Sequence, residues 1–253
     1  MRRQLFVSRS GATTLAMTPG PQLQAALDTA YEVFARHGRP TALDAPPHRR
    51  PEVLLANLTA TPLRELSCEA VGPYAGWAMT TVGDSGNYRH FLPRLLELAA
   101  QGDCAHMGTD PDQLARKVLY GGFRTWPANE RDAIVAVFEA AARQAIGESL
   151  DQATPEPWLT GLAEMGASVS SLLQAWLAAD SLDAGLHLVE AVRSEAHASR
   201  RGGEDQSAPE VQALRLWLRG SAVRERLEAL LLKAPEDEIW RVEAALIESA
   251  AFV

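Results

Sequence analysis

The sequence predicts an all-α fold, an irregular array of antiparallel helices that is either HEAT- or armadillo-like or a layered helical bundle. Alanine and leucine dominate the 253 residues, of which 47% are hydrophobic and 6% aromatic, and both residues lose little conformational freedom in a helix. Apolar residues recur three and four positions apart along most of the chain, which is the period of one helix face. The connections are short, which favours antiparallel neighbours, and the lack of a fixed repeat favours an irregular array over a regular solenoid.

Residues 1–19 are expected to form a flexible N-terminal arm, and residues 20–253 a single helical domain with room for two lobes that meet near 148–154. The arm starts with two arginines, as a signal peptide does. However, its apolar run, Leu5 to Val7, breaks at Ser8 and is too short for export. No window of the chain has the length and apolar character of a membrane span. We therefore expect a cytoplasmic protein that does not bind membranes.

The first helix is expected over residues 21–37, because its apolar residues lie four, three and four positions apart and Gly38 follows its end. A proline-rich connection over residues 40–51 comes next. Thr61-Pro62 has the form of a helix start, which predicts a helix that stops near Gly72-Pro73. A second short helix is expected over residues 74–81.

Asp84 is expected to lie in a turn and to cap the following segment. Pro93 lies inside that segment and predicts either a kink or a fresh helix from Pro93 to Ala100. Asp110 to Gln113 has the form of a capping box and predicts a helix to about Tyr120.

The second half of the chain continues with helices of the same kind. Trp126-Pro127 predicts a helix as far as Gly147, and Thr154-Pro155 one that ends at Gly166. Two further apolar-periodic segments follow, and residues 200–209 are polar and glycine-rich, which predicts a mobile loop. Three helices are expected to close the chain, over residues 209–219, 221–233 and 235–250.

The charge balance is acidic, with 24 basic and 32 acidic residues and a net charge of −8. An acidic surface repels phosphate backbones, so we expect no nucleic-acid partner. The two arginine pairs, at residues 49–50 and 200–201, are interpreted as solvated loop charge. The two cysteines, Cys68 and Cys104, do not make a disulfide framework, and a reducing compartment is the simplest setting for them.

One cluster of side chains could bind a metal ion: Asp84, His90, Asp103, Cys104 and His106. The spacing is poor, so we predict no metal site and keep His90, Cys104 and His106 only as weak candidate ligands. The alternative is a polar loop after a helix, with Cys104 partly buried. The sequence has no nucleophile elbow and no phosphate-binding loop, so no catalytic residue is assigned and no cofactor is expected.

The six tryptophans are spread among leucines, which indicates core positions or positions between lobes. An exposed subset could instead form the centre of a partner-binding surface, because tryptophan is enriched in binding hot spots.

Two blocks of sequence resemble an uncharacterised bacterial family. The first runs from Thr80 to Asp84 and from Tyr88 to Leu98, a threonine-glycine turn and a Phe-Leu-Pro-Arg helix. The second comprises residues 117–120 and Arg124-Thr125-Trp126-Pro127 with Glu130, and the resemblance is centred on residues 60–146. The chain departs from the pattern at Phe123, where a tryptophan is expected, and at the small residues 140–142. The resemblance implies a helical, intracellular bacterial protein and supplies no catalytic residues.

We interpret the chain as a non-enzymatic helical module that binds another protein, with five candidate binding residues: Asp84, Arg89, His90, Arg94 and Trp126. In one form of this hypothesis it is an immunity-type protein, whose acidic charge engages a basic, nucleic-acid-directed bacterial toxin. The alternative is a metal-dependent hydrolase that uses residues between Asp84 and His106. A small-molecule sensor with a pocket between helices is a third hypothesis.

Overall fold

The computed structural model describes residues 18–102, 108–200 and 208–250. In these ranges the chain forms twelve α-helices and three 3₁₀ turns, and no strand beyond one isolated bridge between Ala78 and Val82. The protein is therefore an all-α helical array, as the sequence predicts. None of its described helices combines the length and the hydropathy needed to cross a bilayer.

The first half holds α1 (Pro21–Phe34), η1 (Pro47–Arg49), α2 (Pro51–Leu58), η2 (Leu63–Glu65), α3 (Cys68–Trp77), α4 (Ser85–Gln101), α5 (Pro111–Tyr120), η3 (Phe123–Thr125) and α6 (Ala128–Ala145). The second half holds α7 (Glu156–Glu164), α8 (Ser170–Ala178), α9 (Leu182–Arg200), α10 (Pro209–Leu218), α11 (Ser221–Leu231) and α12 (Glu236–Ser249).

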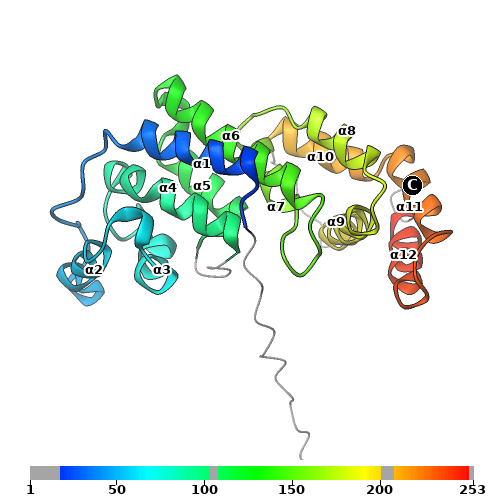
Figure 1. Ribbon diagram of the computed structural model, residues 1–253, viewed down its shortest axis with the longest axis horizontal. Coiled ribbons are helices and arrows are strands. Elements are labelled where there is room, and N and C mark those ends of the chain that lie inside the picture. The colour runs from blue at the N-terminus through cyan, green and yellow to red at the C-terminus, as the bar shows by residue number, and fades with distance from the viewer. Residues whose placement is uncertain (1–17, 103–107, 201–207, 251–253) are drawn as a thin grey trace, which may run out of the picture.

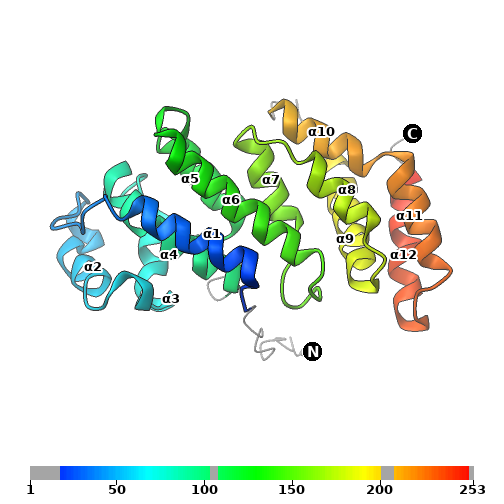
Figure 2. The same cartoon turned by 45° about the horizontal axis from the view of Figure 1, so that its top comes forward.

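The helices form an elongated array, with α2 and α3 at one end and α11 and α12 at the other (Figures 1 and 2). Along the array α1 packs against α4 and α6, α7 against α5, α6 and α10, and α9 against α11 and α12. One hydrophobic core extends from Leu23 in α1 to Ala245 in α12. A continuous core of this kind joins all the layers that the structure describes.

Helices α1 and α6 form a central antiparallel pair that is fixed at both ends. The predicted apolar stripe of α1 is buried between α6 and α4, and its members are Leu23, Leu27, Ala30 and Phe34. Near the start of α1 the Gln144 amide donates a hydrogen bond to the Thr18 carbonyl at 2.9 Å and accepts one from the Gly20 N–H at 2.8 Å. At the other end the C-terminus of α1 meets the N-terminus of α6, where the candidate site lies.

Several local predictions are confirmed. Asp84 caps α4 in a reciprocal box with Asn87, whose N–H donates to Asp84 Oδ1 at 2.8 Å. A left-handed glycine, Gly83 at φ 66°, closes the turn before it. On the same helix Arg94 pairs with Glu97 at 2.6 Å.

The helix predicted from Thr61-Pro62 is wrong in its boundaries. Only a 3₁₀ turn follows Pro62, and α3 begins after Ser67, whose Oγ accepts a hydrogen bond from the Ala70 N–H. Helix α3 then continues through Pro73 to Trp77, so no separate helix begins at residue 74. Pro73 is exposed, and the carbonyl that its missing N–H leaves unpaired can be hydrated there.

Other proline readings also need correction. Pro51, read as part of an irregular connection, is the first residue of α2, a position at which its missing N–H costs no hydrogen bond. Helix α4 is one helix through Pro93, so a fresh helix does not begin at that residue. Helix α5 begins at Pro111 as predicted, but no side-chain cap forms, because the Gln113 amide donates to Asp110 Oδ2 instead.

Cys68, the first residue of α3, is disulfide-bonded. This differs from the expectation of a reduced thiol at this position. Cys104 lies outside the described residues, as do Asp103 and His106, the arm residues 1–17, and residues 201–207 of the predicted loop.

Candidate functional site

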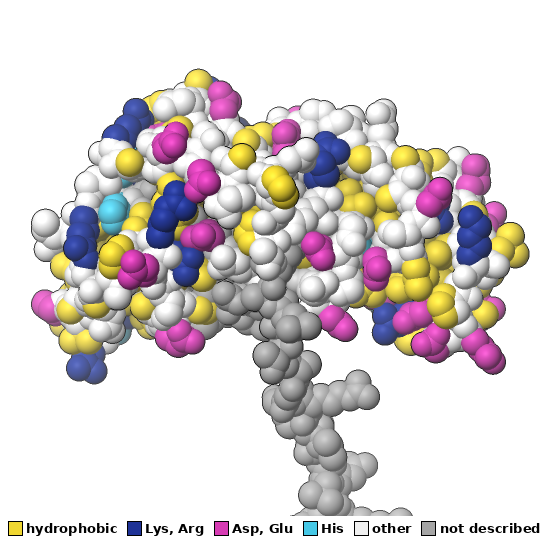
Figure 3. Space-filling model, in the orientation of Figure 1, with side chains coloured by type: hydrophobic (Ala, Val, Ile, Leu, Met, Phe, Trp, Pro, Cys, Tyr) yellow, Lys and Arg dark blue, Asp and Glu magenta, His cyan; other side chains and the backbone are white. Residues whose placement is uncertain are grey.

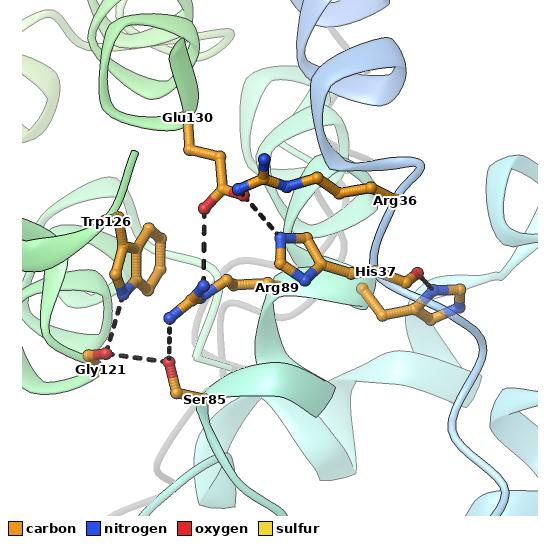
Figure 4. A network of polar contacts seen from close by, with 8 residues as sticks. Arg36, His37, Ser85, Arg89, Gly121, Trp126 and Glu130 are labelled. Atoms are coloured by element: carbon orange, nitrogen blue, oxygen red, sulfur yellow. Dashed lines mark hydrogen bonds and ion pairs between the residues drawn. The ribbon is translucent and has the colours of Figure 1, made fainter. Parts of the chain in front are cut away.

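A fully buried carboxylate, that of Glu130, joins the C-terminal end of α1 to α4 and α6 (Figure 4). Arg36 Nη2 and His37 Nε2 both bind its Oε1 atom, the histidine at 2.7 Å. Arg89 Nη1 lies 3.7 Å from its Oε2 atom. The Glu130 side chain has no exposed surface, whereas Arg36 is 48% and Arg89 is 23% exposed.

The helix ends explain why these charges gather here. Glu130 is the third residue of α6, so its carboxylate lies near the positive end of that helix dipole. Arg36 and His37 follow the last turn of α1, near the negative end of its dipole. Because the two helices are antiparallel, both dipoles favour the same arrangement of charges.

Arg89 lies between the carboxylate and an aromatic ring. Its guanidinium carbon is 4.4 Å from the centroid of Trp126, a cation–π distance. Its Nη2 donates to Ser85 Oγ at 3.3 Å, and Ser85 donates to the Gly121 carbonyl at 2.9 Å. Trp126 Nε1 donates to the same carbonyl at 2.9 Å. These bonds hold Arg89 and Trp126 in fixed positions relative to each other.

The structure brings together only some of the five candidate binding residues. Arg89 and Trp126 are in contact, and His90 reaches the same region through Nδ1, 2.9 Å from the His37 carbonyl. Asp84 is engaged as the cap of α4. Arg94 donates to the Leu66 carbonyl at 2.8 Å and pairs with Glu97, so it makes no contact with the Glu130 carboxylate among the described residues. The binding role of all five residues stays a prediction.

The Glu130 cluster has the chemistry of a structural clamp. Each charged group in it binds another member, and Trp126 is only 3% exposed. Among the described residues no group of three histidine, cysteine, aspartate or glutamate side chains is placed to hold a metal ion. Of the weak metal candidates, His90 binds a carbonyl, and Cys104 and His106 lie outside the described residues.

Sequence reasoning missed the two basic residues that follow α1. Arg36 and His37 directly follow the apolar stripe of α1, and Glu130 lies two residues into α6. A pair of basic residues after one helix and an acidic residue in the first turn of another are detectable signals. What could not be read from the sequence is that α1 and α6 are neighbours across almost one hundred residues of intervening chain.

The last helix carries the second candidate site, an exposed face that we call the α12 face: Glu236, Trp240, Glu243 and Ile247. Trp240 is 56% and Ile247 73% exposed, and they lie seven positions apart, which places both on one side of the helix. The opposite side, with Val242 and Ala245, is buried against the array. In the space-filling view, acidic side chains lie beside hydrophobic ones at the end of the array where α11 and α12 lie (Figure 3).

The α12 face is acidic around its apolar pair. Helix α12 holds five acidic side chains and one arginine, Arg241. Glu238 pairs with Arg241, and Glu248 lies 3.5 Å from Arg193. By contrast, the described residues form no ion pair with Glu236 or Glu243. An exposed tryptophan with unpaired carboxylates beside it is typical of a surface that binds a basic partner.

Comparison of the chain with models of protein families, with curated proteins and with solved structures finds no match. The resemblance to an uncharacterised bacterial family therefore stays a prediction.

Proposed function

We propose that this chain is a helical interaction module that binds a basic segment of a partner protein through the α12 face. The observation that carries the proposal is Trp240, because 56% of its side chain is exposed while Trp126, Trp158 and Trp176 are buried. The guanidinium carbons of Arg241 and Arg193 lie 5.5 and 6.0 Å from the centroid of its ring, and more than half of the residue still stays exposed. A large aromatic side chain on the surface is the kind of residue that dominates binding energies.

Charge complementarity specifies the partner. The unpaired carboxylates of Glu236 and Glu243 flank Trp240 on successive turns, so a partner that covers the indole must approach both. A segment with lysine or arginine residues beside an apolar side chain satisfies these groups, and its association is accelerated at low ionic strength. The net charge of −8 on the whole chain acts in the same direction.

One form of this function is that of an immunity-type protein that neutralises a basic, nucleic-acid-directed toxin. Acidic charge and an all-α fold support it, and the resemblance to a bacterial family is the third support. This form requires that the partner be basic and that its activity stop when the complex forms.

The alternative, a metal-dependent hydrolase, has less support from the geometry. Its proposed residues included Asp84 and His90, and both make hydrogen bonds that position α4. A metal analysis of untagged protein purified without chelators tests it directly, since a stoichiometric transition metal would restore this alternative.

The cytoplasmic location also remains a proposal. The disulfide at Cys68 favours an oxidising compartment instead. Fractionation of the cells that make the protein, read with an antibody against the chain, decides between them.

The test uses a single substitution on the α12 face and a matched control. Trp240→Ala removes the exposed ring from α12. Leu216→Ala removes an apolar side chain, 66% exposed, from α10. Partners are captured from the native host with each variant, identified by mass spectrometry, and then purified and mixed with the chain to measure the dissociation constant.

The proposal expects one directly binding partner with a basic segment, at least about 20-fold weaker binding for Trp240→Ala, and unchanged binding for Leu216→Ala. Binding should weaken as sodium chloride rises. An acidic partner, or equal binding by the wild type and Trp240→Ala, would refute it.

A further inference from the structure

A cavity of about 370 Å³ lies between α1, η2 and α4, away from the α12 face. Its apolar walls are the rings of Tyr31 and Phe34 and the side chains of Leu63 and Pro93. A volume of this size is within the range of pockets that bind small molecules, and such pockets combine apolar walls with a few placed polar groups.

The hydrogen-bond donors of this cavity are already committed to the protein. The Tyr31 hydroxyl donates to Glu97 at 2.6 Å. Arg64 pairs with Asp28 at 2.9 Å, and its guanidinium carbon lies 3.8 Å from the centroid of the Tyr31 ring. A ligand that needs to accept hydrogen bonds therefore competes with bonds that the fold has made.

The acceptors of the cavity are free. His90 Nδ1 lies 2.9 Å from the His37 carbonyl, and because a carbonyl only accepts, Nδ1 carries the proton and Nε2 of the neutral ring is an acceptor. His37 Nε2 likewise donates to the carboxylate of Glu130, so Nδ1 of the neutral His37 ring is also an acceptor. No described residue bonds to either of these free nitrogens or to the exposed Glu32 carboxylate, which also lines the cavity.

We propose that this cavity binds a small aromatic molecule that donates hydrogen bonds through N–H or O–H groups. The aromatic ring packs between the apolar walls, and the N–H or O–H group of the ligand donates a hydrogen bond to His90 Nε2. His90 is held in the required tautomer by the His37 carbonyl, so the acceptor is in place before a ligand arrives. This site is independent of the interaction proposed for the α12 face.

Indole and 1-methylindole form the test pair, because they share the ring system and differ in the one N–H group. Binding of each is followed by ligand-observed NMR and by the imidazole ¹⁵N shifts of the labelled protein. We expect indole to shift the Nε2 resonance of His90 and to bind about tenfold more tightly than 1-methylindole, since only indole can make the hydrogen bond.

Two variants identify the site. His90→Asn keeps a donor near the position of Nδ1 and removes Nε2, so it should bind both probes equally and weakly. Ala35→Trp fills the cavity from its exposed rim without changing a histidine, and it should abolish binding of both probes. His48→Asn, at an exposed histidine of η1, is the control and should bind as the wild type does.

The proposal is wrong if the wild type binds the two probes equally, since the cavity then selects for apolar surface alone. It is equally wrong if millimolar indole leaves the His90 nitrogens unshifted, or if Ala35→Trp binds indole as the wild type does. Each variant is compared with the wild type by circular dichroism, so a loss of fold is distinguished from a loss of binding.

Discussion

Glu130→Gln tests whether the buried carboxylate holds the array together. The glutamine has nearly the same shape but no charge, so it leaves Arg36, His37 and Arg89 facing a neutral amide that has no exposed surface. Removing one member of a buried ion pair costs about 3–5 kcal/mol. Arg36 is 48% and Arg89 is 23% exposed, so both can regain hydration, and we expect a loss of about 2–3 kcal/mol in the free energy of unfolding.

This loss is measured by urea unfolding followed by circular dichroism at pH 7 and low ionic strength. For a chain of this size it corresponds to a fall of about 5–10 °C in Tm. Glu139→Gln is the matched control, because it makes the same chemical change at an exposed position of the same helix. Its expected effect is within about 0.5 kcal/mol of zero.

Substitutions of the two arginines that bind Glu130 test the same clamp. Arg36→Gln removes a half-exposed pair and should cost at most about 1 kcal/mol. Arg89→Gln should cost more, because Arg89 also stacks on Trp126 and bonds Ser85. If Glu130→Gln costs less than about 1 kcal/mol, or if Arg36→Gln is the more damaging of the two arginine changes, the cluster is not the clamp that we infer.

Three further predictions concern packing, pH and redox state. Gly161→Ala should cost about 1–3 kcal/mol, because its Cβ would lie 2.5 Å from the Phe138 ring, whereas Gly38→Ala meets no atom within 4 Å and should be neutral in urea unfolding. Burial lowers the pKa of His187, so as the pH falls the unfolded chain takes up this proton before the folded chain does. The free energy of unfolding should therefore decrease below about pH 6.5, and His187→Gln should reduce that decrease in unfolding curves at pH 5 and 7.5. Cys68 should react with iodoacetamide under denaturing conditions only after reduction, and peptide mapping that finds it alkylated without reductant would contradict the disulfide.

The all-α fold and most helix positions followed from the sequence because they depend on local signals. The stripe from Leu23 to Phe34 and the capping residue Asp84 are set by helix periodicity and by backbone hydrogen bonds within one turn. The errors came from prolines. Pro51 begins a helix and Pro73 lies inside one. Whether a helix continues through a proline depends on whether water can reach the carbonyl that the proline leaves unpaired, which is a property of the tertiary structure.

The sites depend on contacts that local patterns do not contain. The Glu130 cluster needs α1 next to α6, and the cavity needs η2 beside α4, so neither was visible as a spacing of residues. The exposed Trp240 is the converse case. The sequence suggested that some tryptophan could lie on the surface, but only the packing of α12 on α9 and α11 determines which side of that helix stays uncovered.

The two sequence blocks that resemble the bacterial family meet in space at the Glu130 cluster. Arg89 belongs to the first block, and its guanidinium contacts both Trp126 and Glu130, which belong to the second. A pattern made of residues that contact one another inside the protein follows from the requirements of the fold. The predicted resemblance therefore rests on residues of the clamp between α4 and α6, whereas the α12 face, which we propose as the partner-binding surface, lies outside both blocks.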